Sequence, residues 1–474
     1  MSEAKYFMLK SKTIEILKSF SLREWNDCRN YLSSAYLNEN KNLLHLFDLL
    51  KNFYPEFAHE QLTKPHLHLK LFPHQKYHDQ KMRYLLSDLT IKLEDYLAYS
   101  AFYLDQQLQH HLKLKELAKR DCVKSYSNKL KSGEGVKYLN VDHYRNNFDR
   151  EFIHLNHWTS KQRRKEDNGI DKVSYNLDCF YISHKLQFAC EAINAKGLLL
   201  ANENKSDATL LFSHLKANKY DDAPFIQIYH CILKILINIQ PKKQFELLCS
   251  RLIQNENNFS AEDLREMYQY AMNFCIRWIN KGENEYLRVL FDIYKIILNN
   301  RVIFNEGFLS QWDYKNIVTL SLRLEETNWT LRFINDYAVY LRPKEKENAF
   351  IYNLAYYHFF KKQYAKTLGL FQKVVFTDVV YQLDVRSILL KIYFEVGEEE
   401  TFFYHAAAFK AFLHRNKQIA VAQQQLYKNL IQFTQKLIRA GTNSTKLTLI
   451  IKEIDKNPNV ADLKWLKEKV EELQ

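Results

Sequence analysis

The sequence predicts an all-α protein, and three observations carry that prediction. Only 9 Gly and 7 Pro occur in 474 residues, where average usage of roughly 7% and 5% would give about 33 and 24. Turn-rich β folds need these residues, because they supply positive or fixed backbone φ angles. Apolar residues also recur at helical spacings of three and four. Finally, from residue 222 onward the chain reads as helix pairs of similar length, which indicates a helical solenoid.

The N-terminal third contains marked helix starts but no repeat. Ser21 and Glu24 have the spacing of a capping box, in which each side chain bonds the other residue's backbone N–H. The piece 54–79 reads as less regular because it contains Pro55, Pro65 and Pro73. We expect residues 1–131 to be a helical region that caps the array. Its helices are predicted over 9–19, 22–37, 41–53 and one long run, 80–131.

Residues 132–171 form the predicted boundary between this region and the repeats. The glycines at 133 and 135 break the preceding helix, and a helix is expected over 141–158. The polar loop 161–169 follows, and a long helix is predicted from 172 to about 203. The boundary is therefore a linker that contains one helix.

The repeat region is predicted over 172–457. Ser260 and Ser310 each have Asp three residues later, and Asp222 precedes Pro224, so all three predict helix N-termini. Glu398–Glu400 lies where another helix starts, as the helix dipole favours. The first helices of successive pairs are predicted near 222, 262, 311, 348 and 382, and Trp329, Tyr364 and Glu399 start second helices.

A separate amphipathic helix is predicted over 458–474, opened by Asn459. Its apolar positions fall at spacings of three and four on one stripe: Val460, Leu463, Leu466, Val470 and Leu473.

The segment 352–371 resembles a tetratricopeptide repeat. Leu354 and Ala355 match the Leu-small pair of that family, Tyr364 its turn aromatic and Phe371 its second-helix aromatic. Two positions depart from the pattern, Thr367 where Ala is preferred and His358 where Tyr is preferred. In the next unit Leu389, Tyr393 and Gly397 match, so the resemblance is clearest over about 348–415. It implies a right-handed α-solenoid whose concave surface holds another macromolecule.

The same resemblance implies which side chains line the groove. They are Tyr352, Asn353, Tyr356, Phe359 and Lys391. A groove lined by tyrosines suits an extended or helical apolar segment of a protein partner. The alternative for these aromatic residues is packing within the core.

A second interpretation comes from charge. The chain has 68 Lys+Arg against 55 Asp+Glu, a formal net charge of +13, which favours an acidic partner. Two basic segments, 113–131 and 161–165, could bind nucleic acid, with Tyr126, Tyr138 and Tyr144 nearby for base stacking. The alternative is a solvated surface. The candidate phosphate contacts are Lys113, Lys119, Lys124, Arg163 and Arg164.

Catalytic and metal motifs do not occur in the sequence. It has no G-x-S-x-G, H-E-x-x-H, Walker A or G-x-G-x-x-G pattern, so we predict no catalytic residues, no metal site and no cofactor. The close pairs His66/His68 and His74/His78 are interpreted as exposed or capping side chains rather than metal ligands. An enzyme of unknown class in the N-terminal region is a third interpretation.

Location follows from the cysteines and the apolar stretches. Seven scattered cysteines without C-x-x-C favour a reducing compartment, and polar residues interrupt the most apolar stretch, 225–239. We therefore expect a soluble cytoplasmic protein that does not enter a membrane. The predicted function is a non-catalytic interaction scaffold that binds a protein or peptide, with nucleic-acid binding as the alternative.

Overall fold

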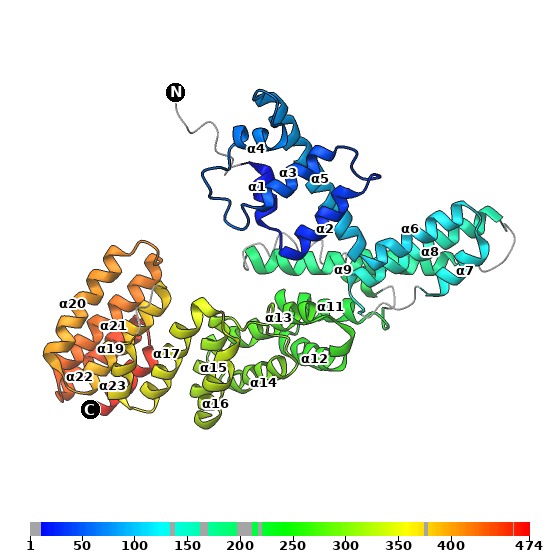
Figure 1. The fold of residues 1–474 in the computed structure, drawn as a ribbon. Coiled ribbons are helices and arrows are strands. Elements are labelled where there is room, and N and C mark those ends of the chain that lie inside the picture. The colour runs from blue at the N-terminus through cyan, green and yellow to red at the C-terminus, as the bar shows by residue number, and fades with distance from the viewer. Residues whose placement is uncertain are drawn as a thin grey trace. The chain divides into compact units, whose positions relative to one another are not determined.

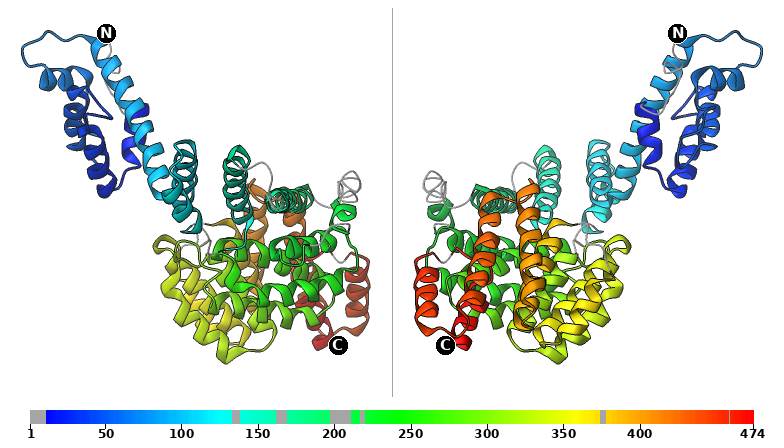
Figure 2. Two further views of the ribbon diagram at one scale, coloured as in Figure 1. Left: turned by 90° about the vertical axis from the view of Figure 1, so that its right-hand side faces the viewer. Right: turned by 90° about the vertical axis from the view of Figure 1, so that its left-hand side faces the viewer.

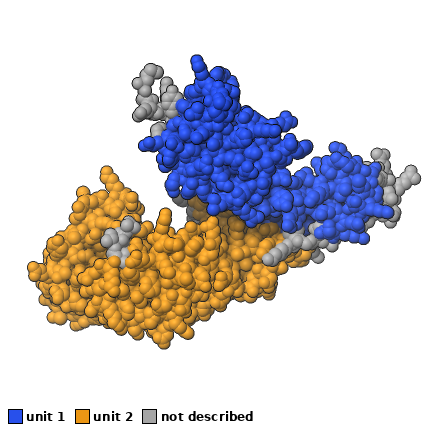
Figure 3. All heavy atoms as spheres, in the orientation of Figure 1, with its two compact units in different colours: residues 1–136, 141–181 blue, residues 137–140, 182–474 orange. Residues whose placement is uncertain are grey.

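The structure is a computed structural model that describes residues 11–132, 138–161, 169–196, 211–216, 220–373, 378–457 and 459–474. Within these ranges every regular element is helical, and β structure is limited to isolated bridges. The all-α prediction is therefore confirmed for the described residues, among which no helix has both the length and the apolarity to cross a bilayer. The chain divides into two compact units, shown in Figure 3: unit 1 (1–136 and 141–181) and unit 2 (137–140 and 182–474).

Unit 1 begins with five helices around one aromatic core. They are α1 (Lys12–Lys18), α2 (Leu22–Ser33), α3 (Lys41–Lys51), α4 (Lys64–Leu71) and α5 (Asp79–Leu104) (Figure 1). Trp25 is fully buried, and its ring lies 4.6 Å from that of Phe47 and 6.0 Å from that of Phe20. The predicted capping box at Ser21 and Glu24 is confirmed. His78 caps α5 by accepting a hydrogen bond from the backbone N–H of Lys81.

His68, predicted to be an exposed or capping side chain, is instead buried in α4 among the rings of Phe72 and Tyr77. Two further predictions for this region are wrong. The piece 54–79 contains α4, because Pro65 lies in the first turn, where a helix does not need the missing N–H. The long helix expected over 80–131 is three helices: α5, α6 (Gln106–Lys119) and α7 (Val123–Ser132). Asp105 ends α5 and caps α6 by accepting a hydrogen bond from Leu108 N–H, and Asp121 between α6 and α7 has φ of 56°. Helical periodicity does not reveal such breaks, because a capping Asp resembles an ordinary surface residue.

Two longer helices complete unit 1. Helix α8 (Val141–Lys161) packs against α6, and α6 also packs against α7. Helix α9 (Ile170–Lys196) follows, and the division between the units falls within it.

Unit 2 consists of helices that pack against their neighbours in sequence, and Figure 2 shows them from two sides. The described helices are α11 (Pro224–Leu236), α12 (Pro241–Gln254), α13 (Ala261–Asn280), α14 (Glu285–Asn299), α15 (Gln311–Arg323), α16 (Thr327–Tyr337), α17 (Pro343–Phe360), α18 (Tyr364–Phe371), α19 (Val379–Glu395), α20 (Glu399–Arg415), α21 (Val421–Ala440), α22 (Ser444–Lys456) and α23 (Leu463–Leu473). First helices start at 224, 261, 311, 343 and 379, close to the predicted positions.

The predicted helix starts of unit 2 are right at some positions and wrong at others. Ser260 and Asp263 form the expected capping box. Ser310 caps α15 differently, accepting a hydrogen bond from the N–H of Trp312 one residue earlier than predicted. Helix α11 has Ala223 at its N-cap with no side-chain cap, because Pro224 fixes φ and needs no hydrogen-bonded N–H.

The hairpin α17–α18 contains the segment that resembles a tetratricopeptide repeat. Ala355 and Thr367 are both fully buried between its two helices. The hydroxyl of Thr367 donates a hydrogen bond to the carbonyl oxygen of Ala355 at 3.2 Å. This bond explains how Thr replaces the preferred Ala without leaving a buried hydroxyl unpaired.

The last helix, α23, begins at Leu463 rather than directly after Asn459 as predicted. Leu466 and Val470 are fully buried and belong to a core cluster that includes Phe402 and Leu437 of α20 and α21. The predicted apolar stripe of this segment therefore packs against the preceding helices.

Candidate functional site

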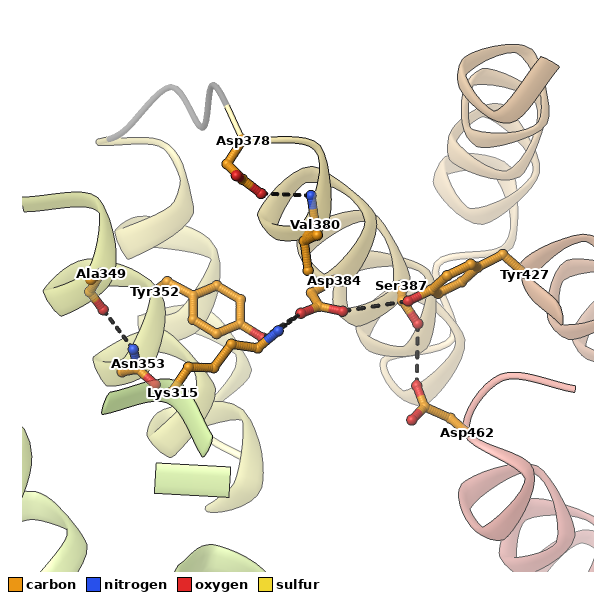
Figure 4. Close-up of polar contacts among 10 residues, drawn as sticks. All are labelled: Lys315, Ala349, Tyr352, Asn353, Asp378, Val380, Asp384, Ser387, Tyr427 and Asp462. Carbon is orange, nitrogen blue, oxygen red and sulfur yellow. Dashed lines mark hydrogen bonds and ion pairs between the residues drawn. The ribbon is translucent and has the colours of Figure 1, made fainter. Parts of the chain in front are cut away.

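Four helices of unit 2 meet side by side. Helix α17 contacts both α15 and α19, and α19 contacts α21. These are the first helices of successive pairs, and we call the surface that they share the first-helix face. Two polar clusters lie on it, one around Asp384 and the other around Asp462 (Figure 4).

Asp384 of α19 joins three neighbouring helices. One of its carboxylate oxygens accepts an ion-paired hydrogen bond from Lys315 of α15 and a 3.3 Å bond from the hydroxyl of Tyr352 on α17. The other accepts a 3.4 Å hydrogen bond from the hydroxyl of Tyr427 on α21. Figure 4 shows Lys315 and Tyr352 on one side of Asp384 and Tyr427 on the other. Burial, reinforced by the Asp384 charge, raises the pKa of Tyr352 and of Tyr427, so both hydroxyls remain donors at neutral pH.

Three aromatic rings surround the ammonium of Lys315. Its Nζ lies 5.5 Å from the ring centroid of Tyr352, 5.7 Å from that of Tyr381 and 6.0 Å from that of Trp312. Trp312 and Tyr381 stack on each other at 5.3 Å. The rings supply cation–π attraction to a side chain that is only 17% exposed, and Asp384 supplies the neutralising charge.

Asp462 forms the second cluster with residues of α19. Its Oδ2 lies 2.6 Å from Nζ of Lys391 and accepts a 3.2 Å hydrogen bond from the hydroxyl of Ser387. Burial acts to raise the pKa of Asp462, but the Lys391 charge and these two hydrogen bonds outweigh it, so the pKa is lowered. The Lys391 ammonium also lies 5.1 Å from the ring centroid of Phe359 and 5.9 Å from that of Trp465.

The backbone at Asp462 is shaped by this contact. Asp462 is the N-cap of α23, but its side chain makes no capping hydrogen bond, and its φ of 51° and ψ of 40° are left-handed. Asp tolerates this region better than most residues. The carboxylate therefore links the start of α23 to α19 instead of satisfying its own helix.

The structure brings four of the five predicted groove residues into one row. The ring of Tyr356 lies 6.2 Å from that of Tyr352 and 6.3 Å from that of Phe359, and Lys391 contacts Phe359. Asn353 does not join them. It is fully buried, and its side chain donates a 2.8 Å hydrogen bond to the carbonyl oxygen of Ala349 in its own helix. Tyr352 and Lys391 are also buried and held by residues of this chain, whereas Tyr356 and Phe359 are half-buried.

The predicted phosphate contacts lie in unit 1. Lys113 and Lys119 are exposed on α6, and Lys124 is exposed on α7. Arg163 and Arg164 lie outside the described residues.

Sequence reasoning missed several members of the two clusters. They are Lys315, Asp384, Ser387, Tyr427 and Asp462. A signal was present in α19, because three charged residues, Asp384, Arg386 and Lys391, interrupt a largely apolar run over 379–394. Charges on a helix that is apolar on most sides point to buried partners, but the pattern does not say which partners.

The arrangement presents hydroxyl groups and apolar rings beside two aspartates. Each aspartate is neutralised by a lysine, so the clusters supply hydrogen-bonding tyrosines and apolar rings rather than a reactive acid–base pair. Among the described residues, no group of three or more His, Cys, Asp and Glu side chains is arranged to hold a metal ion.

Comparisons of the chain with protein-family models, with curated proteins and with solved structures find no match.

Proposed function

We propose that unit 2 is a right-handed, tetratricopeptide-like superhelix that acts as a non-catalytic scaffold and binds a protein segment along the first-helix face. The observation that carries this proposal is the row of rings Tyr352–Tyr356–Phe359 along α17, in which Tyr352 is buried and Tyr356 and Phe359 are half-buried, flanked by the Asp384 and Asp462 clusters. In a solenoid of this kind, the first helices line the concave surface on which a partner lies.

The chemistry of the face selects the kind of partner. Its two carboxylates already have lysine partners within the chain, so a charged partner gains little from them. Half-buried rings such as Tyr356 and Phe359 gain from covering by apolar side chains. The proposed partner is therefore an uncharged, largely apolar helical or extended segment, and its affinity is expected to change by no more than about twofold over about 50–200 mM salt.

A cytoplasmic location is part of the proposal and is supported by the cysteines. Cys28 and Cys275 are buried free thiols, and burial raises the pKa of each to about 12. Such cysteines act as small apolar packing residues, as is common in a reducing compartment.

Selection of a random-peptide library on the full chain tests the proposal. Selected peptides should be apolar. Tyr356→Ala should weaken their binding by about tenfold or more, because a few aromatic anchors supply most of the affinity of such interfaces. Tyr404→Ala is the matched control, since Tyr404 is 80% exposed on the second helix α20.

Tyr356→Phe distinguishes a docking role from loss of folding. This variant keeps the ring that stacks on Tyr352 and Phe359 and removes only the hydroxyl, so it should retain most of the affinity and the thermal stability. Peptides that bind Tyr356→Ala and Tyr404→Ala with equal affinity, while both variants stay folded by circular dichroism, would contradict the proposal.

A further inference from the structure

Helix α6 of unit 1 borders a groove that it shares with α7. The groove has a volume of about 790 Å³, and beside Leu117 and Glu116 its lining residues carry hydrogen-bond donors: Lys113, Arg120, Ser125, Asn128, Lys129 and Ser132. Its acidic lining residue, Glu116, is paired with Arg120. Lys113 and Arg120 are seven residues apart, about 10 Å at the helical rise, so positive charge extends along the groove.

A second groove of about 550 Å³ lies between α6 and α8, and it contains an aromatic side chain. Leu112, Phe152 and Ile153 line it with apolar surface, Lys115 and Lys119 of α6 add two cations, and Asp149 of α8 adds one carboxylate. Phe152 is 45% exposed and stacks on Phe148 at 5.6 Å with an interplanar angle of 14°. An exposed aromatic face of this kind is a platform for a planar ring.

The lysines of α6 and α7 are not neutralised within the described part of the chain. Residues 106–132 contain seven Lys and Arg against Glu116 and Asp121. Arg120 pairs with Glu116, whereas the six lysines make no ion pair there, and Lys113 donates a hydrogen bond to the neutral side chain of Gln109. Their charges are therefore available to an external anion.

We propose that helices α6–α8 bind single-stranded nucleic acid, with phosphates in the α6–α7 groove and a base stacked on Phe152 in the α6–α8 groove. Phosphate binding uses the Lys, Arg, Ser and Asn donors that line the first groove. Base stacking uses the exposed ring in the second, and a cationic groove beside an aromatic platform is the usual design for single strands. Anionic bilayers are a poorer fit, because a lipid headgroup supplies no planar base to stack on Phe152. The proposal concerns unit 1 and does not depend on peptide binding by unit 2.

Fluorescence anisotropy of the full chain with labelled oligo-dT and oligo-U tests the proposal. If Lys113, Arg120 and Lys129 of the α6–α7 groove contact three phosphates, log K should fall with log[salt] with a slope of about −2.1. Affinity should then fall about 20-fold between about 50 and 200 mM salt. A slope near zero would overturn the proposal.

Two variants separate the roles of the grooves. The triple variant Lys113→Gln, Arg120→Gln, Lys129→Gln should weaken binding at low salt at least about tenfold and reduce the slope by about 2. Its control, Lys361→Gln, Lys366→Gln, Lys373→Gln, removes the same charge from exposed positions of unit 2 and should bind like the unmodified chain. Phe152→Ala should weaken binding about tenfold without changing the slope, whereas Phe152→Leu tests whether apolar cover alone suffices.

Competition experiments distinguish specific binding of nucleic acid from general binding of polyanions. Unlabelled oligo-U should displace the probe, whereas polyglutamate and phosphatidylserine vesicles at equal charge should not. Equal competition by either, full affinity in Phe152→Ala, or equal loss in the two triple variants would each overturn the proposal.

Discussion

The first-helix face of unit 2 and the α6–α7 hairpin of unit 1 both contain lysines, but the lysines differ in burial and in ion pairing. Lys315 and Lys391 on the face are 17% and 7% exposed, and each is paired with an aspartate. Lys113, Lys119 and Lys124 on the hairpin are exposed and have no ion-pair partner among the described residues.

Burial explains this difference. Removing an ammonium from water costs several kcal/mol, so a buried lysine requires a carboxylate close by. An exposed lysine keeps its hydration and requires none. The paired charges therefore mark positions that hold helices together, and the unpaired charges mark a surface on which an anion can still bind.

The largest effect should come from breaking the pair that contains the most buried lysine of the face. Asp462→Ala leaves the Lys391 ammonium buried without a partner and should lower the free energy of unfolding by about 3 kcal/mol, measured by urea titration. Asp462→Asn should lower the free energy of unfolding less, because Asn tolerates the left-handed backbone and keeps a hydrogen-bond acceptor. Adding Lys391→Met to Asp462→Ala should recover much of the loss, and a purely additive double variant would show that the pair is not coupled.

A smaller loss is expected at the other lysine of the face. Lys315→Met keeps a flexible side chain among Trp312, Tyr352 and Tyr381 but removes the ion pair with Asp384. Because Asp384 retains two tyrosine hydroxyls and is 23% exposed, the free energy of unfolding should fall by only about 1–2 kcal/mol. If Lys315→Met lowered the free energy of unfolding as much as Asp462→Ala does, the exposure of the residue left without its partner would not determine the size of the effect.

Acid should weaken helices α6–α8 before it breaks the Asp462–Lys391 pair of the face. Burial, followed by nearby cations such as Lys129, lowers the pKa of His110, and burial likewise lowers that of His111 and His154. Below about pH 6.5 these histidines bind protons more readily in the unfolded chain than in the folded one. The stability that the neutral histidines contribute is therefore present above about pH 6.5 and is lost as pH falls below it. The pKa of Asp462 is lowered from 3.8, so its stabilisation is kept until much lower pH.

Hydrogen exchange read by mass spectrometry can localise this acid effect. Between about pH 7.5 and 5, after correction for intrinsic rates, amide protection in α6–α8 should drop about three- to tenfold, while protection in α15 and α17 should change little. Equal loss in both regions would contradict the expected order.

The smallest effect is expected for single lysines of the hairpin. Lys119→Gln should change the free energy of unfolding by no more than about 0.5 kcal/mol, because its ammonium is exposed and unpaired. Thermal unfolding of Lys119→Gln and of Lys315→Met under the same conditions compares the loss of an exposed, unpaired lysine with the loss of a largely buried, paired one. A clear destabilisation by Lys119→Gln would mean that the hairpin charges are structural after all.

Much of the fold could be predicted from local pattern. The helices, the capping boxes at Ser21 and Ser260 and the starts of the first helices depend on residues close in sequence, and the structure agrees with them. Predictions failed where a single polar residue decides a break, as at Asp105 and Asp121, since these residues look like ordinary members of an amphipathic surface.

The candidate site could be predicted only in part. The row of Tyr352, Tyr356 and Phe359 follows from helical spacing within one helix. The partners of that row could not be found, because Lys315 lies 69 residues from Asp384 and Lys391 lies 71 residues from Asp462. No local rule links such pairs.

The sequence by itself determined that this chain is helical, that its helices come in pairs and that α6 and α7 are rich in positive charge. These properties depend on residues within a few helical turns of one another, so they can be read from periodicity and composition. Only the tertiary structure decided which charges are neutralised. Whether an ammonium meets a carboxylate depends on how helices far apart in the chain stack and on how much water their packing removes.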